Sequence, residues 1–314
     1  MDLGVQIEPQ LGFKFEDVLA IAVDAERAGF TRLWVSDHLF LDPDAVNTDC
    51  LEAWSLLAAL AVRTERIRIG PMVTSQSYRN PALLAKIAAG VDVMSGGRLD
   101  FGLGAGWKDV EYRAYGYEFP DGPTRVTQMI ETLEICTRMW KDEHATYQGK
   151  YYRIADALCS PKPTQKPLPI WVGGSKPRVM RAAARFAHAF NFNMGTSAKT
   201  ETLKVAMAEL DDICMAVKRK PSTLLRSSFL MSAVGESAGR SEALLKELAS
   251  NQGTTTAKIL EQRPGLLRES PEHVLARLRE YAALGIAHVN IMFQPYGSER
   301  EQIAALASIT AKLA

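Results

Sequence analysis

Residues 3–35 read LGVQIEPQLGFKFEDVLAIAVDAERAGFTRLWV and contain a strand, a helix and a second strand in that order. The first strand, residues 3–7, is short and rich in β-forming side chains. Residues 15–28 repeat apolar side chains every three or four positions, as an amphipathic helix does, and Gly29 follows as a C-terminal glycine. Residues 33–35 form the second strand. This order is typical of two parallel strands joined by a crossover helix.

The same alternation continues to the other end of the chain. We expect six further strands, at residues 67–69, 98–103, 170–172, 187–192, 226–234 and 288–293. Helical patterns occur between them and after the last one, at residues 51–63, 81–94, 125–140, 200–217, 271–284 and 299–313. Eight strands separated by helices favour an α/β fold, the (β/α)8 TIM barrel. A doubly wound open sheet is the alternative, but it usually has a glycine-rich turn after its first strand, which is missing here.

Three segments stand outside this repeating pattern. Residues 146–152 carry aromatic side chains on both sides of Gln148-Gly149, which predicts a hairpin insertion with its turn at those two residues. The proline-rich residues 160–169 are too short for a domain linker, and we interpret them as an extended loop. No element is assigned to residues 237–264.

The composition is that of an ordinary globular protein without a strong charge. The 314 residues are 47% hydrophobic and 23% charged, which suffices for one substantial core, and we predict a single domain over residues 1–314. With 37 Lys and Arg against 36 Asp and Glu, the formal net charge is +1. No basic field is therefore expected to hold a nucleic acid or an anionic membrane, and small-molecule partners are favoured.

The N-terminus, the cysteines and the histidines favour a cytoplasmic protein without a metal. The chain starts directly with the first strand, and no apolar run approaches the roughly 18 to 20 residues of a membrane span. The four cysteines form no CxxC pair, as in a reducing compartment. No HxH or HxxxH spacing occurs among the five histidines, which are His38, His144, His188, His273 and His288.

Polar residues follow the second and sixth strands, and reactive residues of such a barrel lie where strands end. Ser36, Asp37 and His38 follow the second strand. A histidine there can act as an acid or base near neutral pH, and an adjacent carboxylate can bias its protonation. Asn191 and Asn193 end the sixth strand, and their amides could bind a ring or a substrate. The alternative for both tails is a loop that caps the next helix or turn.

Glycine-rich tails follow the third, fourth and fifth strands. Gly70 and Pro71 suggest a bulge that brings the backbone of residues 72–74 towards a ligand. Residues 102–107, GLGAGW, place three glycines at alternate positions, which allows a flat ring or a phosphate to come close. Residues 173–175, GGS, precede a helix and suggest a phosphate site. Ordinary strand ends and β-to-α turns are the alternatives.

Taken together, four motifs resemble those of the luciferase-like monooxygenase superfamily. They are LWVSDH at residues 33–38, YRNPALLAK at residues 78–86, GRL to GAGW at residues 97–107 and PIWVGG at residues 169–174. The motifs follow one another in the expected order at the ends of successive barrel units. The resemblance extends from residue 3 to about residue 193, and the last strand and helix also fit it. It implies the barrel of the bacterial luciferase-like proteins.

Within that superfamily, the Ser-Asp-His tail is similar to the branch that uses coenzyme F420, a 5-deazaflavin that carries hydride and does not readily activate oxygen. The resemblance implies two catalytic residues, with His38 as proton donor or acceptor near the ring and Asp37 beside it. It also implies a non-prolyl cis peptide around Met72 and Val73 that backs the ring, and a phosphate at residues 173–174. The residues expected to bind the cofactor are Ser36, Met72, Val73, Thr74, Gly104, Ala105, Gly106, Trp107, Gly173, Gly174, Ser175 and Asn193.

The function implied is hydride transfer between F420 and a small, apolar organic substrate. An FMN-dependent monooxygenase that uses oxygen is the alternative in the same fold, and a barrel that binds a flavin without catalysis is a second one. A separate reductase or dehydrogenase would recycle the cofactor. The apolar helices at residues 51–60 and 130–139 could form a homodimer face as easily as pack on the barrel.

Two features bear on the substrate. The sugar-phosphate dehydrogenases of this branch carry a glutamate just after the glycine turn, where this chain has Trp107. Sugar-phosphate oxidation is therefore not expected. Aromatic side chains near the strand tails favour a hydrophobic or planar substrate, with core packing as the alternative for each of them; they are Trp34, Phe40, Trp107 and Phe192.

Overall fold

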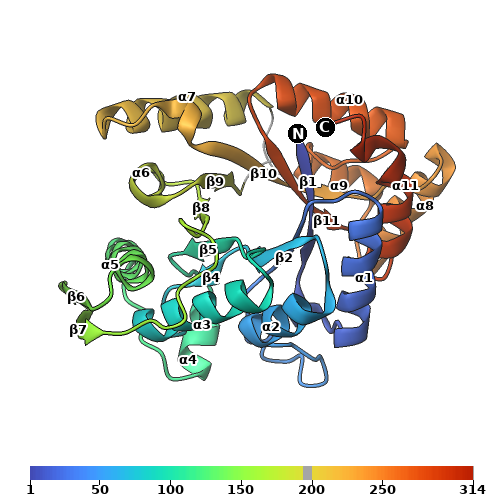
Figure 1. Cartoon of the computed structure of the whole chain (residues 1–314). Coiled ribbons are helices and arrows are strands. Elements are labelled where there is room, and N and C mark those ends of the chain that lie inside the picture. Colours follow the sequence, from blue (N-terminus) through green and yellow to red (C-terminus); the bar gives the residue numbers. More distant parts are fainter. Residues whose placement is uncertain (194–199, 314) are drawn as a thin grey trace.

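The chain forms a barrel of parallel strands with helices around it (Figure 1). The computed structural model describes residues 1–193 and 200–313. Within these residues the main sheet has the order β3-β2-β1-β11-β10-β9-β8-β5-β4, and all its neighbouring pairs are parallel. Its strands are β1 (Asp2–Ile7), β2 (Arg32–Val35), β3 (Arg68–Pro71), β4 (Thr74–Ser75), β5 (Phe101–Gly104), β8 (Ile170–Gly174), β9 (Ala189–Phe192), β10 (Leu225–Ser232) and β11 (His288–Phe293).

The third barrel strand is interrupted, so the nine segments correspond to eight barrel strands. β3 pairs with β2 and β4 pairs with β5, which means that both ends of the sheet order belong to the same interrupted strand. A bridge between Ile69 and Leu99 joins the two neighbouring strand regions at a second point. The sheet is therefore closed, and the predicted (β/α)8 TIM barrel is confirmed.

Helices follow the strands and surround the barrel (Figure 1). Several begin at a side chain that caps them: Glu52 accepts from the N–H groups of Trp54 and Ser55, and Asn80 accepts from Ala82. The helices around the barrel are α1 (Phe15–Arg27), α2 (Ala53–Arg63), α3 (Pro81–Met94), α4 (Asp109–Ala114), α5 (Gly122–Lys141), α6 (Pro177–Phe186), α7 (Thr200–Ala216), α10 (Pro271–Ala283) and α11 (Glu299–Thr310).

Side chains fill the half of the barrel where the strands begin. Trp34, Trp171 and His288 pack edge to face there, and Trp34 Nε1 donates to His288 Nε2 over 3.1 Å. Arg32 and the buried carboxylate of Asp100 form an ion pair of 2.9 Å at the same end. Because this end is packed, a ligand would have to enter the barrel from the end where the strands finish.

The predicted hairpin insertion is present, but its turn is wider than predicted. β6 (Ala145–Gln148) and β7 (Arg153–Ala157) are antiparallel, and residues 149–152 connect them. The prediction of a turn at Gln148-Gly149 alone is therefore wrong. The reason is the buried carboxylate of Glu131 in α5, which accepts three consecutive N–H groups of the turn, those of Lys150, Tyr151 and Tyr152.

The segment without an assigned element forms two helices, α8 (Ala238–Asn251) and α9 (Thr256–Gln262). Ser237 caps α8 and Thr255 caps α9, each through a side-chain oxygen that accepts a backbone N–H. The two helices share a small core that is separate from the core of the barrel. Its buried residues are Ala233, Leu244, Leu245, Leu248, Ala249, Ile259 and Leu266.

The apolar helices considered for a dimer face pack against their own barrel. Leu57 and Leu60 of α2 and Leu133 and Ile135 of α5 are fully buried in the main core. This packing explains their apolar character, and a homodimer stays a prediction. Among residues 1–193 and 200–313, none of the helices combines the length and the apolar character needed to cross a membrane.

Candidate functional site

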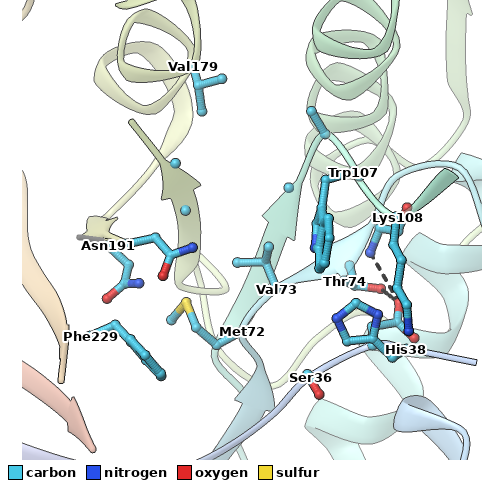
Figure 2. Close-up of a pocket in the computed structure, with 18 of the residues that line it drawn as sticks. Ser36, His38, Met72, Val73, Thr74, Trp107, Lys108, Val179, Asn191 and Phe229 are labelled. Carbon is cyan, nitrogen blue, oxygen red and sulfur yellow. Dashed lines mark hydrogen bonds between the residues drawn. The ribbon is translucent and has the colours of Figure 1, made fainter. Parts of the chain in front are cut away.

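A cavity of about 520 Å³ opens where the barrel strands end (Figure 2). Every residue predicted for the site lines it, because the carboxyl ends of the strands meet at this end of the barrel. The predicted residues are Ser36, Asp37, His38, Met72, Val73, Thr74, Gly104, Ala105, Gly106, Trp107, Gly173, Gly174, Ser175 and Asn193. The structure thus brings together residues from five strand tails, and their individual roles stay predictions.

The ring of His38 is bonded to a carboxylate that comes from a distant part of the chain. His38 Nδ1 lies 3.1 Å from Oε1 and 3.0 Å from Oε2 of Glu111, a residue of α4. Trp107 stands edge-on to the His38 ring, with 5.6 Å between the ring centroids. These two neighbours hold the imidazole at the wall of the cavity (Figure 2).

Hydrogen-bond donors surround the fully buried carboxylate of Glu111. Oε2 accepts from Tyr78 Oη at 2.6 Å, and Oε1 accepts from the Leu39 N–H at 3.0 Å and Lys108 Nζ at 3.2 Å. Burial by itself raises the pKa of this carboxyl, but the hydrogen bonds from His38 and Tyr78 outweigh it and lower the pKa from 4.5 to about 2. Glu111 is therefore ionised near neutral pH.

Asp37 is not the carboxylate that contacts the His38 ring, which corrects the expectation from the sequence. Its Oδ2 and Oδ1 accept from the Arg79 guanidinium at 2.7 and 3.0 Å, and Oδ2 also accepts from Thr74 Oγ1 at 2.5 Å. The reason is geometric, because successive side chains of an extended segment point to opposite sides. Asp37 thus ties the tail of β2 to β4, and its bonds lie away from the imidazole.

The floor of the cavity is the segment between β3 and β4. The Met72–Val73 peptide bond in it is cis, as the resemblance implied. Val73 points at two glycines of neighbouring strands: a Cβ on Gly104 would lie 2.4 Å from Val73 Cγ2, and a Cβ on Gly173 would lie 3.2 Å from Val73 Cγ1. The missing side chain at residue 104 therefore leaves room for Val73, which packs over the two glycines and forms the apolar floor.

The glycine turn after β5 brings two side chains to the rim. Gly106 has a φ of +77°, and a Cβ there would lie 1.8 Å from Tyr112 Oη, so both the conformation and the space require glycine. Trp107 and Lys108 follow directly and line the cavity. Lys108 Nζ also donates to the backbone oxygens of Phe40 and Leu41, each at 2.7 Å, and so holds the loop after β2 against α4.

The glycine-rich end of β8 leads into the first turn of α6. Residues 173–176 line the cavity next to this helix N-terminus, where the helix dipole favours an anion. The first turn of α6 contains no acidic side chain, and the exposed Lys176 adds a positive charge. This side of the cavity suits a phosphate group.

Gln6, Glu8 and Ser36 line another part of the cavity and belong to a chain of hydrogen bonds that ends at Glu8. Glu8 Oε1 accepts from Gln6 Nε2 at 2.8 Å, and Oε2 accepts from Gln10 Nε2 at 2.6 Å. The amide oxygens accept in turn: Gln6 from Asn290 Nδ2 at 2.7 Å, and Gln10 from Ser36 Oγ at 2.8 Å. All four bonds are directed towards the carboxylate, which therefore presents its remaining lone pairs as acceptors.

Asn191 and Phe229 line the cavity on the side of β9 and β10. Asn191 Oδ1 accepts from Ser227 Oγ at 2.9 Å, and among the described residues its amide N–H groups have no acceptor, which leaves them for a ligand. In Figure 2, Asn191, Phe229 and Met72 lie to one side of Val73, and His38 lies with Trp107 and Lys108 to the other. The cavity thus has an amide-bearing side and a histidine-bearing side.

The aromatic lining expected from the sequence is wrong for three of its four residues. Among the described residues that line the cavity, Trp107 is the only one of the four. Trp34 and Phe192 are fully buried, and Phe40 stacks on Tyr115 at a centroid distance of 6.2 Å. Large side chains at a strand tail can point into the core as well as into the mouth, and the pattern alone does not distinguish the two. The actual lining mixes apolar and polar groups.

Comparison with known families gives a match over most of the chain. The family described as "Luciferase-like monooxygenase" matches residues 2–288. The chain belongs to the luciferase-like monooxygenase family. The superfamily inferred from the four motifs is thereby confirmed.

Curated relatives of this luciferase-like protein are named F420-dependent glucose-6-phosphate dehydrogenase. One from Microbacterium testaceum is 34% identical over 200 residues, which is 62% of this chain and 57% of the relative. One from Segniliparus rotundus is 28% identical over 299 residues, which is 88% of each chain. The match thus spans little more than half the length of the first relative.

A solved structure confirms the shared barrel. It is described as an F420-dependent secondary alcohol dehydrogenase in complex with an F420-acetone adduct, and it superposes with a TM-score of 0.84. The alignment covers 100% of this chain and 99% of that chain, at 19% sequence identity. At that identity the likeness establishes the fold.

Several residues of this luciferase-like site were not predicted from the sequence. Gln6 and Glu8 lie at the tail of the first strand, so the rule applied to the other tails would have found them. Tyr78 belongs to one of the four motifs. Glu111 carries no such signal, because it lies on a short helix whose contact with His38 depends on the tertiary fold. In the part of the chain that the structure describes, no group of three or more potential ligands is placed to hold a metal ion.

Proposed function

We propose that this protein is an oxidoreductase that transfers a hydride between coenzyme F420 and a small organic substrate. The observation that carries the proposal is the position of His38, bonded to Glu111, on the wall of a cavity that is also lined by Val73 and the glycines next to it. The family membership and the F420-dependent names of the curated relatives support the choice of cofactor.

The residues present fit a flat ring that carries a phosphate group. Val73 packs over Gly104 and Gly173 and offers an apolar surface on which a ring can lie, and the α6 N-terminus beside residues 173–176 suits the phosphate. When bound, the deazaflavin would supply a ring carbon that accepts or releases hydride. The residues proposed to hold it are Ser36, Met72, Val73, Thr74, Gly104, Ala105, Gly106, Trp107, Gly173, Gly174, Ser175 and Asn193.

His38 would hold the proton that accompanies the hydride. Nδ1 is bonded to Glu111. Nε2 has no partner among the described residues and can therefore contact a ligand. An imidazole can release or take up a proton near neutral pH, which suits a group that must do both in a reversible reaction. Asp37 would act at a distance, by fixing Thr74 and the backbone beside the floor.

The lining supports a substrate with a hydroxyl or carbonyl group on a partly apolar body. Glu8 offers carboxylate lone pairs, and Asn191 offers amide N–H groups, so the wall can both accept from and donate to a hydroxyl. Phe229 and Met72 supply apolar surface beside these groups. The substrate is thus less apolar than the sequence suggested. Trp107, in place of the glutamate of the sugar-phosphate dehydrogenases, argues against a sugar phosphate.

The cofactor would be recycled by a separate enzyme. A hydride taken up by F420 must leave it before the next turnover. We therefore infer a partner reductase or dehydrogenase that binds F420 in turn, and a freely exchanging cofactor.

The proposed function is tested by following the absorbance of oxidised and reduced F420 in the presence of the purified protein. The substrate panel contains secondary alcohols, neutral polyols, aldehydes, ketones and glucose 6-phosphate. We expect hydride transfer with neutral hydroxyl or carbonyl compounds and little with glucose 6-phosphate.

A parallel assay follows oxygen consumption with reduced FMN. Oxygen-dependent turnover with FMN and none with F420 would identify the protein as a monooxygenase and contradict the proposal. Tight F420 binding without turnover across the panel would favour a protein that only binds the cofactor.

A further inference from the structure

The ionised carboxylate of Glu111 restricts the protonation state of the His38 ring. Both carboxylate oxygens lie within hydrogen-bond distance of Nδ1, at 3.1 and 3.0 Å. An ionised carboxylate can only accept hydrogen bonds, so Nδ1 must be the donor and must carry a hydrogen. In the neutral imidazole the other nitrogen, Nε2, then has none.

The carboxylate itself is held from three segments of the chain. Tyr78 Oη donates to Oε2 at 2.6 Å, the Leu39 N–H donates to Oε1 at 3.0 Å, and Lys108 Nζ donates to Oε1 at 3.2 Å. Burial, together with the hydrogen bond to Glu111, raises the pKa of Tyr78 far above its usual range, so its hydroxyl stays a donor. These three donors hold the Glu111 carboxylate against His38 and keep it a hydrogen-bond acceptor.

The carboxylate next to His38 in sequence cannot replace Glu111. Asp37 is saturated by Arg79, by the Thr74 hydroxyl and by the Ser75 N–H. The two carboxylates near the imidazole therefore have separate tasks: Asp37 holds Thr74 and the Ser75 backbone beside the floor, and Glu111 holds the imidazole ring.

We propose that Glu111 is the positioning residue of this site: it fixes His38 as the Nδ1–H tautomer and so presents Nε2 to the cavity as a proton acceptor. The inference rests on the proposed function, and it adds a preference for substrates that give up a proton as they give up hydride, which describes an alcohol. Glu111 touches neither cofactor nor substrate cavity in this scheme and acts through His38.

The test is nitrogen-15 NMR of the full-length protein with labelled histidine, recorded at alkaline pH where imidazoles are neutral. The His38 signals are identified by their loss in His38→Asn. We expect a protonated-type shift for Nδ1 and an unprotonated-type shift for Nε2 in the wild type. A wild-type His38 that carries its hydrogen on Nε2 overturns the proposal, whatever the variants do.

Two variants separate the positioning role from general damage. Glu111→Gln removes the charge and keeps the shape, and because its amide can turn either way, we expect both His38 tautomers to appear. Glu131→Gln is the matched control, since Glu131 is also a buried carboxylate that accepts backbone N–H groups, but on the hairpin. It should leave the His38 signals unchanged. Unchanged His38 signals in folded Glu111→Gln would contradict the proposal.

Tyr78→Phe is a second probe that does not depend on the fold of Glu111→Gln. It removes one donor from Glu111 and keeps the contact with His38, so the Nδ1–H tautomer should persist.

With F420 and an active alcohol, Glu111→Gln should lower kcat by about tenfold or more with F420 affinity nearly unchanged. Absence of wild-type turnover would count against the proposed function, while the NMR result would still decide the role of Glu111.

Discussion

The chemistry of single side chains in this barrel depends on which partners bind each of its two buried carboxylates. Asp37 and Glu111 are both buried and both close to the tail of β2, yet Asp37 is paired with Arg79, while Glu111 is paired with Lys108 and bonded to the His38 ring. A buried charge requires such a partner, because desolvation strongly disfavours an unpaired one. Asp37 is thereby bound to the backbone of the floor, and Glu111 is left to hold the His38 imidazole.

Replacement of His38 by Ala should lower turnover on the order of a hundredfold, because a general acid or base is lost. The affinity for F420 should change much less, since the glycines and the α6 N-terminus remain. Stopped-flow measurement of F420 absorbance gives the first quantity and a fluorescence titration gives the second. Unchanged turnover would remove His38 from the mechanism.

Glu111 should also make stability depend on acid pH. Its pKa is about 2 in the folded protein against 4.5 as the ordinary value, so below pH 4.5 the unfolded chain takes up a proton that the folded chain does not. The free energy of unfolding should therefore fall as the pH drops from 4.5 towards 2, with a contribution from Glu111 of roughly 3 kcal/mol, at about 1.4 kcal/mol per pKa unit.

Urea titrations at several acid pH values, on the wild type and Glu111→Gln, measure this contribution. The variant should be less stable near neutral pH, and its curve should approach that of the wild type as the pH falls. Parallel curves for the two proteins would show that the Glu111 pKa is not depressed.

The sequence could predict where most of these side chains gather, but not which of them bind each other. Ser36, His38, Thr74 and Asn193 reach one cavity because the strands of a parallel barrel all end on the same side. The partner of His38 could not be predicted in this way. Glu111 lies on α4, outside any strand tail, and its contact follows from how that helix packs.

Among the strands and turns, the glycine turn after β5 determines the shape of the histidine-bearing side. Gly106 takes a left-handed conformation under Tyr112, whose hydroxyl is bonded to Ser75 at 2.9 Å. The turn therefore links β4, β5 and α4, and its next residue is Trp107. A change in this turn should disturb Trp107 and the helix that carries Glu111 together.

Gly106→Ala should lower the free energy of unfolding by about 3 kcal/mol or more, since it adds a steric clash to the cost of a left-handed alanine. Gly116→Ala is its matched control, because Gly116 has a similar φ of +75° with nothing within 4 Å of the added Cβ. The control should lose only about 1 kcal/mol. Urea unfolding of both variants gives these values, and equal losses would mean that the turn relaxes without cost.

The periodicity of apolar residues predicts the type of each element better than it predicts where the element begins and ends. The strand-helix alternation predicted the eight barrel strands, because buried parallel strands are short apolar runs. The predicted position of the hairpin turn is wrong because the Glu131 carboxylate of α5 binds three N–H groups of the turn, a contact that the hairpin sequence does not reveal. Residues 238–262 were not assigned, although the caps Ser237 and Thr255 stand directly before two helices and could have been recognised.

The molecule as a whole consists of a large barrel core and a small satellite core under α8 and α9. A small cluster stabilises its helices less than the main core does, so α8 and α9 should open locally at a lower free energy than the strands. Both termini belong to the main body, where the Met1 amino group donates to the Leu313 oxygen at 2.6 Å (Figure 1).

Leu248→Ala and Leu60→Ala test this division, because both side chains are buried and each substitution typically costs about 2–5 kcal/mol. In hydrogen exchange followed by mass spectrometry, the α8 substitution should speed exchange mainly within residues 238–262. The α2 substitution should speed it in the barrel strands. Faster exchange of β1 and β11 in Leu248→Ala would show that the satellite core is an integral part of the barrel.

The central claim is that the cavity binds the deazaflavin, and equilibrium titration with F420 and FMN in parallel tests it most directly. Fluorescence is followed for the oxidised and reduced form of each cofactor. The structure and the family together predict a micromolar or lower Kd for F420, and binding of FMN weaker by at least about tenfold, or ~1.4 kcal/mol. The reverse preference would contradict the assignment and make oxygen chemistry with FMN the function to pursue.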